Sequence, residues 1–449
     1  MLKLLRLPKF DCDPEVRGDR NRWFSGLAVL ILALILVLCC RKPQIPGESD
    51  STLVFAQWWE DEMEAGSLQA LVDEFREQYP EINVRLDTRS YGEIRDRLLY
   101  AGENGEGEEA PRGEGAVSGA PLRADILGLD PRWIGELAEN RRLEHLDADH
   151  TDSEGRTISF YVPRGTVALP LASFMTPLFY NVELLEAAGF DRPPKNRTEF
   201  LNAARAVTNP RKGQYGFALA LNPENPGGIA ADIYSWFRAA NGPLLDRGNP
   251  RFNTPEAIEV LGFLRELYRS SLISPLSFSK TEAEKLEEFM DGRIAMMIAS
   301  VRDIPRIRER DVPFGVTAVP GSASSFGKPA FGLYGWYAGI SAASPNKADA
   351  RTFLSFLAGN RVRLGAAARA VPGGGDAAGD YINDDPLFSK VYSIYEAGDV
   401  LEEFTGRRSA AEEETLVWKA LYRMLEEGRT PAETAAAIQQ GWEALRNRY

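Results

Sequence analysis

Tryptophan and tyrosine side chains are the residues of this 449-residue chain whose types and spacing most readily suggest chemistry. Trp58 and Trp59 directly follow a short apolar stretch, and Trp133 follows a second one. Asp130 stands three residues before Trp133. Sugars bind proteins by stacking their C–H faces on aromatic rings, while carboxylates and amides bind the hydroxyl groups. The pattern therefore favours a site for a small ligand, with a carbohydrate as the first hypothesis.

Two further aromatic pairs extend this pattern. Tyr234 and Trp236 stand at the start of a predicted helix, and Tyr334 and Trp336 lie in a glycine-rich stretch. For any single ring, burial in a hydrophobic core is an equally good interpretation. Several rings placed at strand ends and in loops are harder to explain by core packing, and so the set as a whole favours a binding site.

Motifs for catalysis or metal binding are incomplete. Residues 321–328 (GSASSFGK) are similar to a phosphate-binding loop, but five residues separate the glycines and Pro329 stands where the motif requires Ser or Thr. His145 and His150 could hold a metal together with nearby aspartates, but carboxylates in solvated turns are common. Two histidines without cysteine partners leave little room for a nucleophilic triad. We expect no metal, no cofactor and no enzymatic activity, although the 65 acidic residues keep a glycan-cleaving enzyme as an alternative.

Charge and cysteine content limit the partners and the compartment. The formal net charge of −13 argues against nucleic acid, because phosphate binding requires clustered Lys and Arg. A hydrophobic fraction of 44% and a charged fraction of 26% are typical of a soluble globular body, and the length indicates two or three units. The three cysteines are Cys12, Cys39 and Cys40, so the chain after residue 40 has no cysteine that could mispair during export.

The N-terminal segment predicts a membrane tether. Residues 23–40 form an apolar run that would span about 27 Å as a helix, close to the thickness of a bilayer core. Basic residues precede the run, which predicts that residues 1–22 stay in the cytoplasm and that the rest lies on the periplasmic side. The run ends at Cys39 and Cys40, like a bacterial lipoprotein signal, but the residue before the cysteine, where a small residue is usual, is Leu38 or Cys39. A cleaved, lipidated signal and an uncleaved anchor are therefore equal alternatives, and residues 41–51 predict a polar linker.

Apolar patterns after residue 51 predict alternating strands and helices. The expected strands are 53–56, 82–86, 125–129, 216–220, 294–298 and 314–319. The expected helices begin near Ser67, Thr198, Thr254, Ser344 and Thr430, the last with the spacing of a capping box to Glu433. Residues 102–120 are rich in Gly and Glu and predict a surface loop. The alternation predicts an α/β fold with mostly parallel sheets.

The order of these segments resembles one known family. Residues 168–220 are similar to the crossover segment of family 1 extracellular solute-binding proteins of ABC importers, the maltose-binding-protein-like group. Further matches follow in order: LVFAQWW, LVDEFREQYPEINV, ADILGLDPRW, FMDGRIAMMIAS, VTAVPG and GWYAGISAASPNKADARTFLSFLAG. The resemblance implies the type II periplasmic-binding-protein fold, with two α/β lobes joined by hinge strands that close on a ligand. It implies a first lobe of residues 51–172 and 319–368, and a second of residues 173–318 and 369–449.

The resemblance also implies which residues line the cleft. They are the aromatic, acidic and hydroxyl residues that match the family's ligand-contacting positions: Trp58, Trp59, Glu60, Asp130, Trp133, Thr176, Tyr234, Trp236, Tyr334 and Trp336. Arg302 departs from the pattern, because some sugar-binding members have an aromatic residue there. An arginine at this position either favours an acidic or phosphorylated ligand or pairs with Asp303.

The leading hypothesis is a tethered, monomeric receptor that delivers a small ligand, a sugar first of all, to the permease subunits of an ABC importer. A second hypothesis is a tethered sensor that presents its ligand to a membrane signalling protein. The third hypothesis is a glycan-cleaving enzyme, and turnover of a glycan by the purified protein would distinguish it from the other two.

Overall fold

The structure is a computed structural model that describes residues 52–99, 122–146, 160–162, 165–223, 228–240, 244–246, 249–322, 332–373, 379–397 and 408–448. The chain divides into residues 1–50 and 51–449, and every described residue lies in the second unit. The predicted tether, with Cys39 and Cys40, and the predicted loop 102–120 fall outside the described residues. Within them, no helix is long and apolar enough to cross a membrane.

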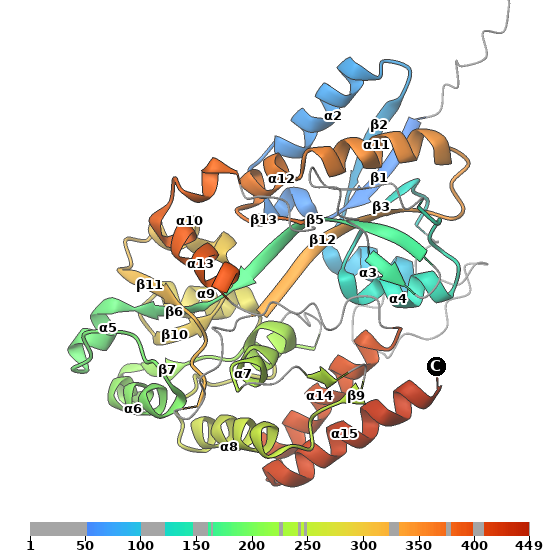
Figure 1. The fold of residues 1–449 in the computed structure, drawn as a ribbon. Coiled ribbons are helices and arrows are strands. Elements are labelled where there is room, and N and C mark those ends of the chain that lie inside the picture. The colour runs from blue at the N-terminus through green and yellow to red at the C-terminus, as the bar shows by residue number, and fades with distance from the viewer. Residues whose placement is uncertain are drawn as a thin grey trace, which may run out of the picture. The chain divides into compact units, whose positions relative to one another are not determined.

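A seven-stranded sheet forms the centre of the first lobe (Figure 1). Its order is β13-β5-β12-β3-β1-β2, with β4 beside β5. The bounds are β1 Thr52–Gln57, β2 Asn83–Thr88, β3 Ile126–Leu129, β4 Phe160–Val162, β5 Gly165–Thr176, β12 Gly332–Ile340 and β13 Val371–Pro372. Strands β1, β2 and β3 are parallel, while β12 runs antiparallel to both β3 and β5.

Helices cover this sheet by burying one apolar face each. In α2 (Ser67–Gln78) the buried residues are Leu68, Leu71, Val72 and Phe75, which recur at helical spacing. The other helices of this lobe are α3 Tyr91–Leu99, α4 Pro131–Glu139, α11 Lys347–Gly359 and α12 Arg361–Ala368, and a short 3-10 turn η1, Trp59–Glu62, follows β1. Together with the sheet they enclose one hydrophobic core, which defines lobe one here.

A four-stranded sheet of order β11-β6-β10-β7 forms the centre of lobe two. Its strands are β6 Leu178–Asn181, β7 Tyr215–Phe217, β10 Ile294–Ile298 and β11 Phe314–Thr317. All five residues of β10 are buried, which explains its continuous apolar sequence. A second hydrophobic core surrounds this sheet, and a short hairpin of β8 (Leu245–Asp246) and β9 (Asn249–Pro250) lies apart from it.

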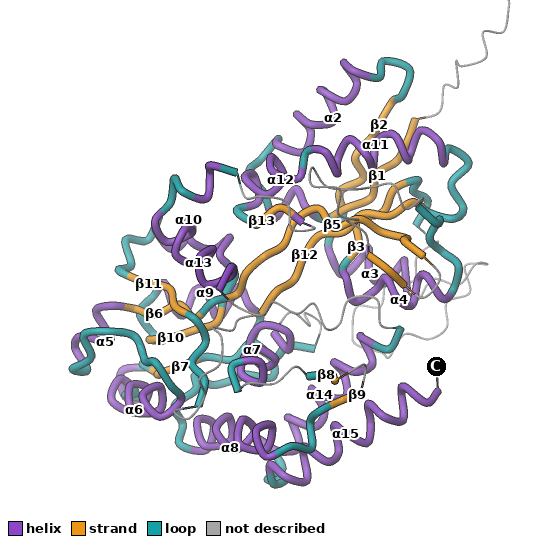
Figure 2. Tube along the Cα trace, in the orientation of Figure 1, coloured by secondary structure: helices purple, strands orange, loops and turns teal. Residues whose placement is uncertain are grey.

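Lobe two carries most of the helices. They are α5 Val182–Ala187, α6 Arg197–Val207, α7 Ser235–Arg238, α8 Pro255–Arg269, α9 Glu282–Met290, α10 Ile304–Arg308, α13 Pro386–Ala397, α14 Ala410–Leu425 and α15 Pro431–Arg448. Shorter helical segments are η2 Pro210–Lys212, η3 Ile229–Tyr234, η4 Val301–Asp303 and η6 Asp380–Ile382. In Figure 2 strands β6, β7, β10 and β11 lie at the lobe-two end of β5 and β12, with helices α5 and α6 on their outer side.

The two longest strands connect the lobes. Strand β5 runs toward lobe two and is separated from β6 by Pro177 alone, while β12 lies beside β5 along its length (Figure 1). The α/β class predicted from the sequence is confirmed, and so are its two lobes. The prediction of mostly parallel sheets is wrong, because among the described strands three pairs are parallel and seven are antiparallel. The lobe boundaries predicted at residues 173, 319 and 369 stay a prediction.

Helix starts test the sequence reasoning in detail. The Thr254 hydroxyl accepts a hydrogen bond from the Ala257 amide at 3.2 Å, and Thr430 and Glu433 form both bonds of a capping box, so both predicted starts are confirmed. The start at Ser344 is wrong, because α11 begins at Lys347. The Ser344 hydroxyl instead donates to Asp125 at 2.6 Å. Ser344, which precedes Pro345, therefore stabilises the loop before α11 and does not mark the start of the helix.

Candidate functional site

An aromatic wall stands in lobe one where β12 meets the turn after β1. The rings of Trp59 and Trp336 stack with centroids 5.1 Å apart and an interplanar angle of 10°. Phe174 of β5 contacts the edge of Trp336 at 4.9 Å and stacks on Tyr334 at 4.9 Å. Trp59 and Trp336 are almost completely buried, and Tyr334 is partly exposed. Three aromatic residues predicted for the site are thus brought together by strands distant in sequence.

A second aromatic group lies on the other side of Trp58. The Trp58 ring lies 5.3 Å from Tyr91 and 5.4 Å from Trp133, and those two rings lie 4.9 Å apart. Trp58 also contacts the edge of Trp59 at 6.1 Å, so the two groups are continuous. The contacts of Trp58 with Tyr91 and Trp59 are edge-to-face, and such contacts stabilise the arrangement of the rings beyond their burial by about 0.5–1.5 kcal/mol per pair.

Glu62 joins the aromatic wall to lobe two, a role that the sequence analysis did not predict. The indole Nε1 of Trp336 donates to Glu62 Oε2 at 3.1 Å. The other oxygen, Oε1, lies 2.6 Å from Nη1 of Arg302, which belongs to η4 in lobe two. We call the group Trp59, Glu62, Arg302, Tyr334 and Trp336 the lobe junction. No sequence pattern pairs Glu62 with Arg302, which lies 240 positions away. The one sequence feature that could have drawn attention to Glu62 is its place in the acidic run after Trp59.

Burial and charge together set the electrostatics of the lobe junction. Burial raises the pKa of Asp303 to about 6, although Arg302 beside it acts in the opposite direction. Burial also raises the pKa of the Tyr334 phenol, so this group stays neutral at physiological pH. Arg302 remains charged between Glu62 and Asp303. The interpretation from the sequence, in which Arg302 pairs with Asp303, therefore did not include Glu62 of the opposite lobe.

Asp130 is engaged in structural contacts. Its Oδ1 accepts the Arg132 amide at 2.9 Å and thereby caps α4, as a side-chain acceptor at a helix start does. Both of its carboxylate oxygens also accept from the Arg132 guanidinium at 2.7 Å. Arg132 reaches Glu414 of α14 in lobe two, with an ion-pair distance of 3.0 Å. Arg132 and Glu414 were not predicted as functional residues, and they form a further polar connection between the lobes.

The remaining predicted residues lie in different surroundings. Glu60 is partly exposed and accepts hydrogen bonds from Thr88 and from Gln57 Nε2, the latter at 3.5 Å. Thr176, at the end of β5, is buried, and its hydroxyl has no hydrogen-bond partner among the described residues. A buried hydroxyl without a partner normally carries a free-energy cost, so a ligand hydroxyl is a fitting partner for it.

Tyr234 and Trp236 lie in the core of lobe two. The Trp236 ring contacts Phe200 at 5.0 Å, Phe217 at 5.9 Å and Phe263 at 4.8 Å. Tyr234 is 1% exposed and ends the π-helical segment η3. The structure therefore gives Trp236 a packing environment and does not bring it to the lobe junction.

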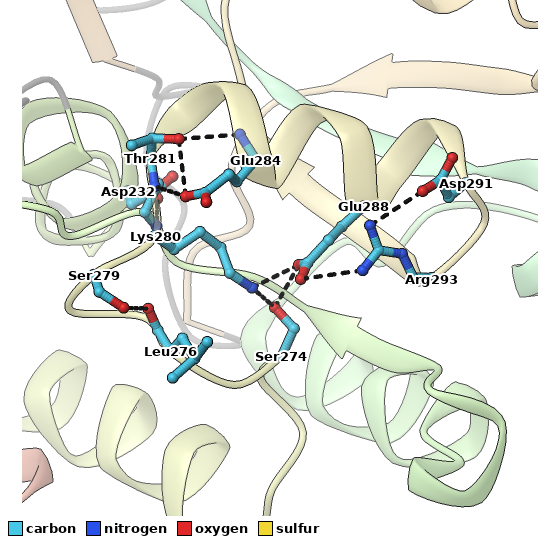
Figure 3. A network of polar contacts seen from close by, with 11 residues as sticks. Asp232, Ser274, Leu276, Ser279, Lys280, Thr281, Glu284, Glu288, Asp291 and Arg293 are labelled. Carbon is cyan, nitrogen blue, oxygen red and sulfur yellow. Dashed lines mark hydrogen bonds and ion pairs between the residues drawn. The ribbon is translucent and has the colours of Figure 1, made fainter.

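Buried charges in lobe two hold the segments near η3 and α9 (Figure 3). Lys285 lies 2.6 Å from Asp232, and Asp232 Oδ2 accepts the Ala220 amide at 2.7 Å. Burial raises the pKa of Asp232 to about 6, against the effect of Lys285. Lys280 pairs with Glu288 at 2.6 Å in the same region. These contacts fix the loop before α9.

The described part of the chain has no group of three or more His, Cys, Asp or Glu side chains that could hold a metal ion. His150 and the aspartates considered with it lie outside that part, and His145 is within it.

Comparisons with known proteins identify relatives. The family profile described as "Bacterial extracellular solute-binding protein" matches residues 59–363. A binding protein of Brucella abortus is 26% identical over 253 residues, which make up 53% of this chain and 59% of that protein. A maltotriose-binding protein of Pyrococcus abyssi is 22% identical over 263 residues, 56% of this chain and 50% of that protein. The chain thus spans no more than about three fifths of the length of these curated relatives.

Solved structures share the fold over almost the whole chain. Maltose-bound MalE3 of T. maritima has a TM-score of 0.69 at 20% identity and covers 88% of this chain and 99% of its own. UgpB of Mycobacterium tuberculosis, in complex with glycerophosphocholine, has a TM-score of 0.69 at 18% identity, with coverage of 89% and 99%. At these identities the likeness is one of fold, and it is the two-lobed α/β fold predicted from the sequence.

Proposed function

Because this chain belongs to the family of bacterial extracellular solute-binding proteins, we propose that it is an extracytoplasmic receptor that binds a small polar ligand between its lobes and delivers it to the permease of an ABC importer. The observation that carries this proposal is the lobe junction. There a stacked pair of tryptophans from lobe one meets a glutamate and an arginine that connect the two lobes. A ligand that binds both sides favours the closed state through its differential affinity.

The chemistry of the junction fits a polyhydroxylated ligand. Tyr334 is the partly exposed ring of the junction, and an aromatic face of this kind stacks on sugar C–H groups, while Glu62 accepts hydrogen bonds and Arg302 donates them. Arg302 lies beside two carboxylates, Glu62 and Asp303, so an anionic ligand would have to displace one of them. This local charge favours a neutral carbohydrate such as those in the names of the maltose- and maltotriose-binding relatives over the phosphodiester bound by UgpB.

The finer parts of the proposal follow the sequence. We propose a monomeric receptor without enzymatic activity, tethered through residues 23–40 as a lipoprotein at Cys39 or Cys40 or as an uncleaved anchor. The proposed lobes comprise residues 51–172 with 319–368, and residues 173–318 with 369–449. The predicted ligand contacts Trp58, Glu60, Asp130, Trp133, Thr176 and Tyr234 remain proposals beside the lobe junction. Trp236, which packs against phenylalanine rings in lobe two, is no longer proposed as a contact.

A thermal-shift screen tests the function and the ligand class together. The purified full chain is mixed with maltose, maltotriose, glycerophosphocholine, polyols and amino acids. A ligand at about 100 times its dissociation constant adds roughly 2.7 kcal/mol of stability, which corresponds to a shift of several degrees. The proposal predicts a shift with a neutral sugar. It is contradicted if the folded protein shows no shift with any of these solutes or if it hydrolyses the glycans.

The Arg302→Gln variant separates the two ligand classes. If the ligand is a neutral sugar, the variant weakens the shift but retains part of it, since Gln still forms hydrogen bonds with hydroxyl groups. If glycerophosphocholine gives the shift and Arg302→Gln abolishes it, the neutral-sugar proposal is wrong and a charged ligand is correct.

A further inference from the structure

Arg132 uses its whole guanidinium group to join the two lobes. Nε and Nη2 each donate to one oxygen of Asp130 at 2.7 Å, and Nη2 also donates to the Tyr91 hydroxyl at 2.9 Å. Nη1 donates to both oxygens of Glu414, at 3.2 and 3.0 Å. Tyr91, Asp130 and Arg132 belong to lobe one, and Glu414 belongs to α14 in lobe two. We call these four residues the Arg132 network.

The Arg132 network is buried and contains one more acid than base. The side chain of Arg132 is 12% exposed, and those of Asp130 and Glu414 are each 5% exposed. Two carboxylates share one guanidinium: Asp130 accepts from both Nε and Nη2 along one edge, whereas Glu414 accepts from Nη1 alone. Of the two carboxylates, Glu414 therefore has the weaker contact with the Arg132 guanidinium. Consistent with this geometry, burial raises the pKa of Glu414 to about 7, even though Arg132 acts to lower it.

The network is also continuous with the aromatic group of lobe one. Tyr91 donates to Asp130 at 3.2 Å through its hydroxyl, while its ring contacts both Trp58 and Trp133. Trp133 is the residue after Arg132 on α4. A movement of α14 that releases Glu414 therefore removes one of the contacts that hold Arg132, and through it Tyr91 and the Trp58–Trp133 pair.

We propose that Arg132 and Glu414 are positioning residues that couple the approach of α14 to the arrangement of the lobe-one aromatic group, and that Glu414 takes up a proton as the lobes close. The effect of this coupling on ligand binding rests on the proposed receptor function. The coupling itself requires no ligand. When the lobes separate, Glu414 becomes solvated and returns to the ordinary acidity of a glutamate. Because the closed state then binds a proton more tightly, lowering the pH favours closure.

Other charged groups surround this contact. On α4 they are Glu136 and Glu139, and on α14 and the residues before it they are Arg408, Glu412 and Glu413. Arg408 lies 3.8 Å from Glu139 in a more exposed ion pair, and Glu413 accepts from the Ser409 hydroxyl at 2.8 Å. Burial and the proximity of Glu412 raise the pKa of Glu136, which acts in the same direction as Glu414.

Distance measurement between the lobes tests the proposal in the full chain. Spin labels on Gln78→Cys in lobe one and Lys212→Cys in lobe two, both exposed positions, report opening in a protein whose native cysteines at 12, 39 and 40 are changed to serine. Between pH 8 and pH 6 a group with a pKa of about 7 in the closed state changes the closed-to-open ratio by about tenfold. A group with a pKa of about 6, such as Asp303, changes it by about twofold over that interval.

The variants give distinct expected results. Glu414→Gln keeps the side-chain shape, and its closed-to-open ratio should lose most of the pH response and stay near the wild-type value at pH 6. Arg132→Met leaves two buried carboxylates without a cation and should shift the distances toward the open state at both pH values. Arg132→Lys should restore closure only in part, since an ammonium cannot hold Asp130 and Glu414 as a planar guanidinium does.

The matched control is Glu74→Gln, which removes an exposed ion pair with Arg363 inside lobe one and should respond to pH like the wild type. The proposal is overturned if the wild-type distances do not change between pH 8 and pH 6, or if Glu414→Gln responds like Glu74→Gln. With maltotriose as the probe, Arg132→Met should bind at least tenfold more weakly. A pH-dependent distance without any ligand binding would support the network and contradict the proposed function instead.

Discussion

The aromatic residues of the two lobes have different polar surroundings. In lobe one the stacked pair Trp59 and Trp336 meets Glu62, and through it Arg302 of the other lobe. In lobe two Trp236 is surrounded by phenylalanine rings, and its Nε1 has no hydrogen-bond partner among the described residues. All three tryptophans are almost completely buried, so burial does not distinguish those of lobe one from Trp236. What distinguishes a candidate site from a core is a polar partner supplied by the opposite lobe.

Removal of the lobe-two ring should have the largest effect on stability. Trp236→Ala leaves a cavity among Phe200, Phe217 and Phe263 and should lower the free energy of unfolding by about 3–5 kcal/mol. Urea denaturation of the wild type and the variant measures this loss, provided that the two proteins have the same m-value. Trp236→Phe retains most of the ring and should lose much less. If Trp236→Ala instead abolished ligand binding with an unchanged midpoint, the comparison between the lobes would fail.

A double-mutant cycle on Glu62 and Arg302 should show the next largest effect. The variants Glu62→Gln and Arg302→Gln, alone and together, are measured by the dissociation constant of the ligand that the screen identifies. Because the two side chains form one inter-lobe ion pair, we expect a coupling energy of about 1–3 kcal/mol. The surface pair Arg363 and Glu74 is the control and should give no coupling in binding. Additive effects at the junction would show that the pair does not act as a unit.

The buried carboxylates predict how stability depends on pH. The pKa of Asp232 is raised to about 6 from an ordinary value near 4, so the folded state holds this proton more tightly than the unfolded state does. Its contribution to stability is therefore fully present below about pH 4 and is lost as the pH rises through about 6. Denaturation midpoints between pH 4 and pH 8 measure the trend. Asp232→Asn should flatten it, and a wild-type protein whose stability rises throughout this interval would contradict the assignment.

The smallest expected effect on stability concerns a substitution in the exposed loop before α9. Leu276 is 75% exposed and has a φ of 66°, a conformation that costs an L-residue about 1–2 kcal/mol. Its carbonyl accepts the amides of Ser279 and Lys280 at 3.0 and 2.8 Å, which holds the loop in place. The Ser279 hydroxyl also donates to this carbonyl, at 3.2 Å (Figure 3). Leu276→Gly should raise the free energy of unfolding by up to about 1 kcal/mol. Leu276→Ala, which keeps the strain, should not raise it.

The sequence predicted elements well and contacts between distant elements poorly. Strand β10 was predicted with its observed bounds because five apolar residues follow a Gly–Arg turn, and the Thr254 and Thr430 caps were predicted because capping is local. The family resemblance gave the two lobes. The partners Glu62 with Arg302 and Arg132 with Glu414 are 240 and 282 positions apart, and no local pattern specifies such pairs. For the same reason Trp236 could not be separated from Trp336 before the surroundings of each ring were known.

The most direct test of the lobe junction compares Trp336→Phe with Trp236→Phe by isothermal titration of the ligand found in the screen. Trp336→Phe removes the hydrogen bond to Glu62 while keeping an aromatic ring, and a bond to a charged group contributes about 1.5–3 kcal/mol. We predict a dissociation constant at least tenfold higher for Trp336→Phe and an unchanged one for Trp236→Phe. Equal constants for Trp336→Phe and the wild type, or a loss of binding confined to Trp236→Phe, would contradict the assignment of the ligand site to the lobe junction.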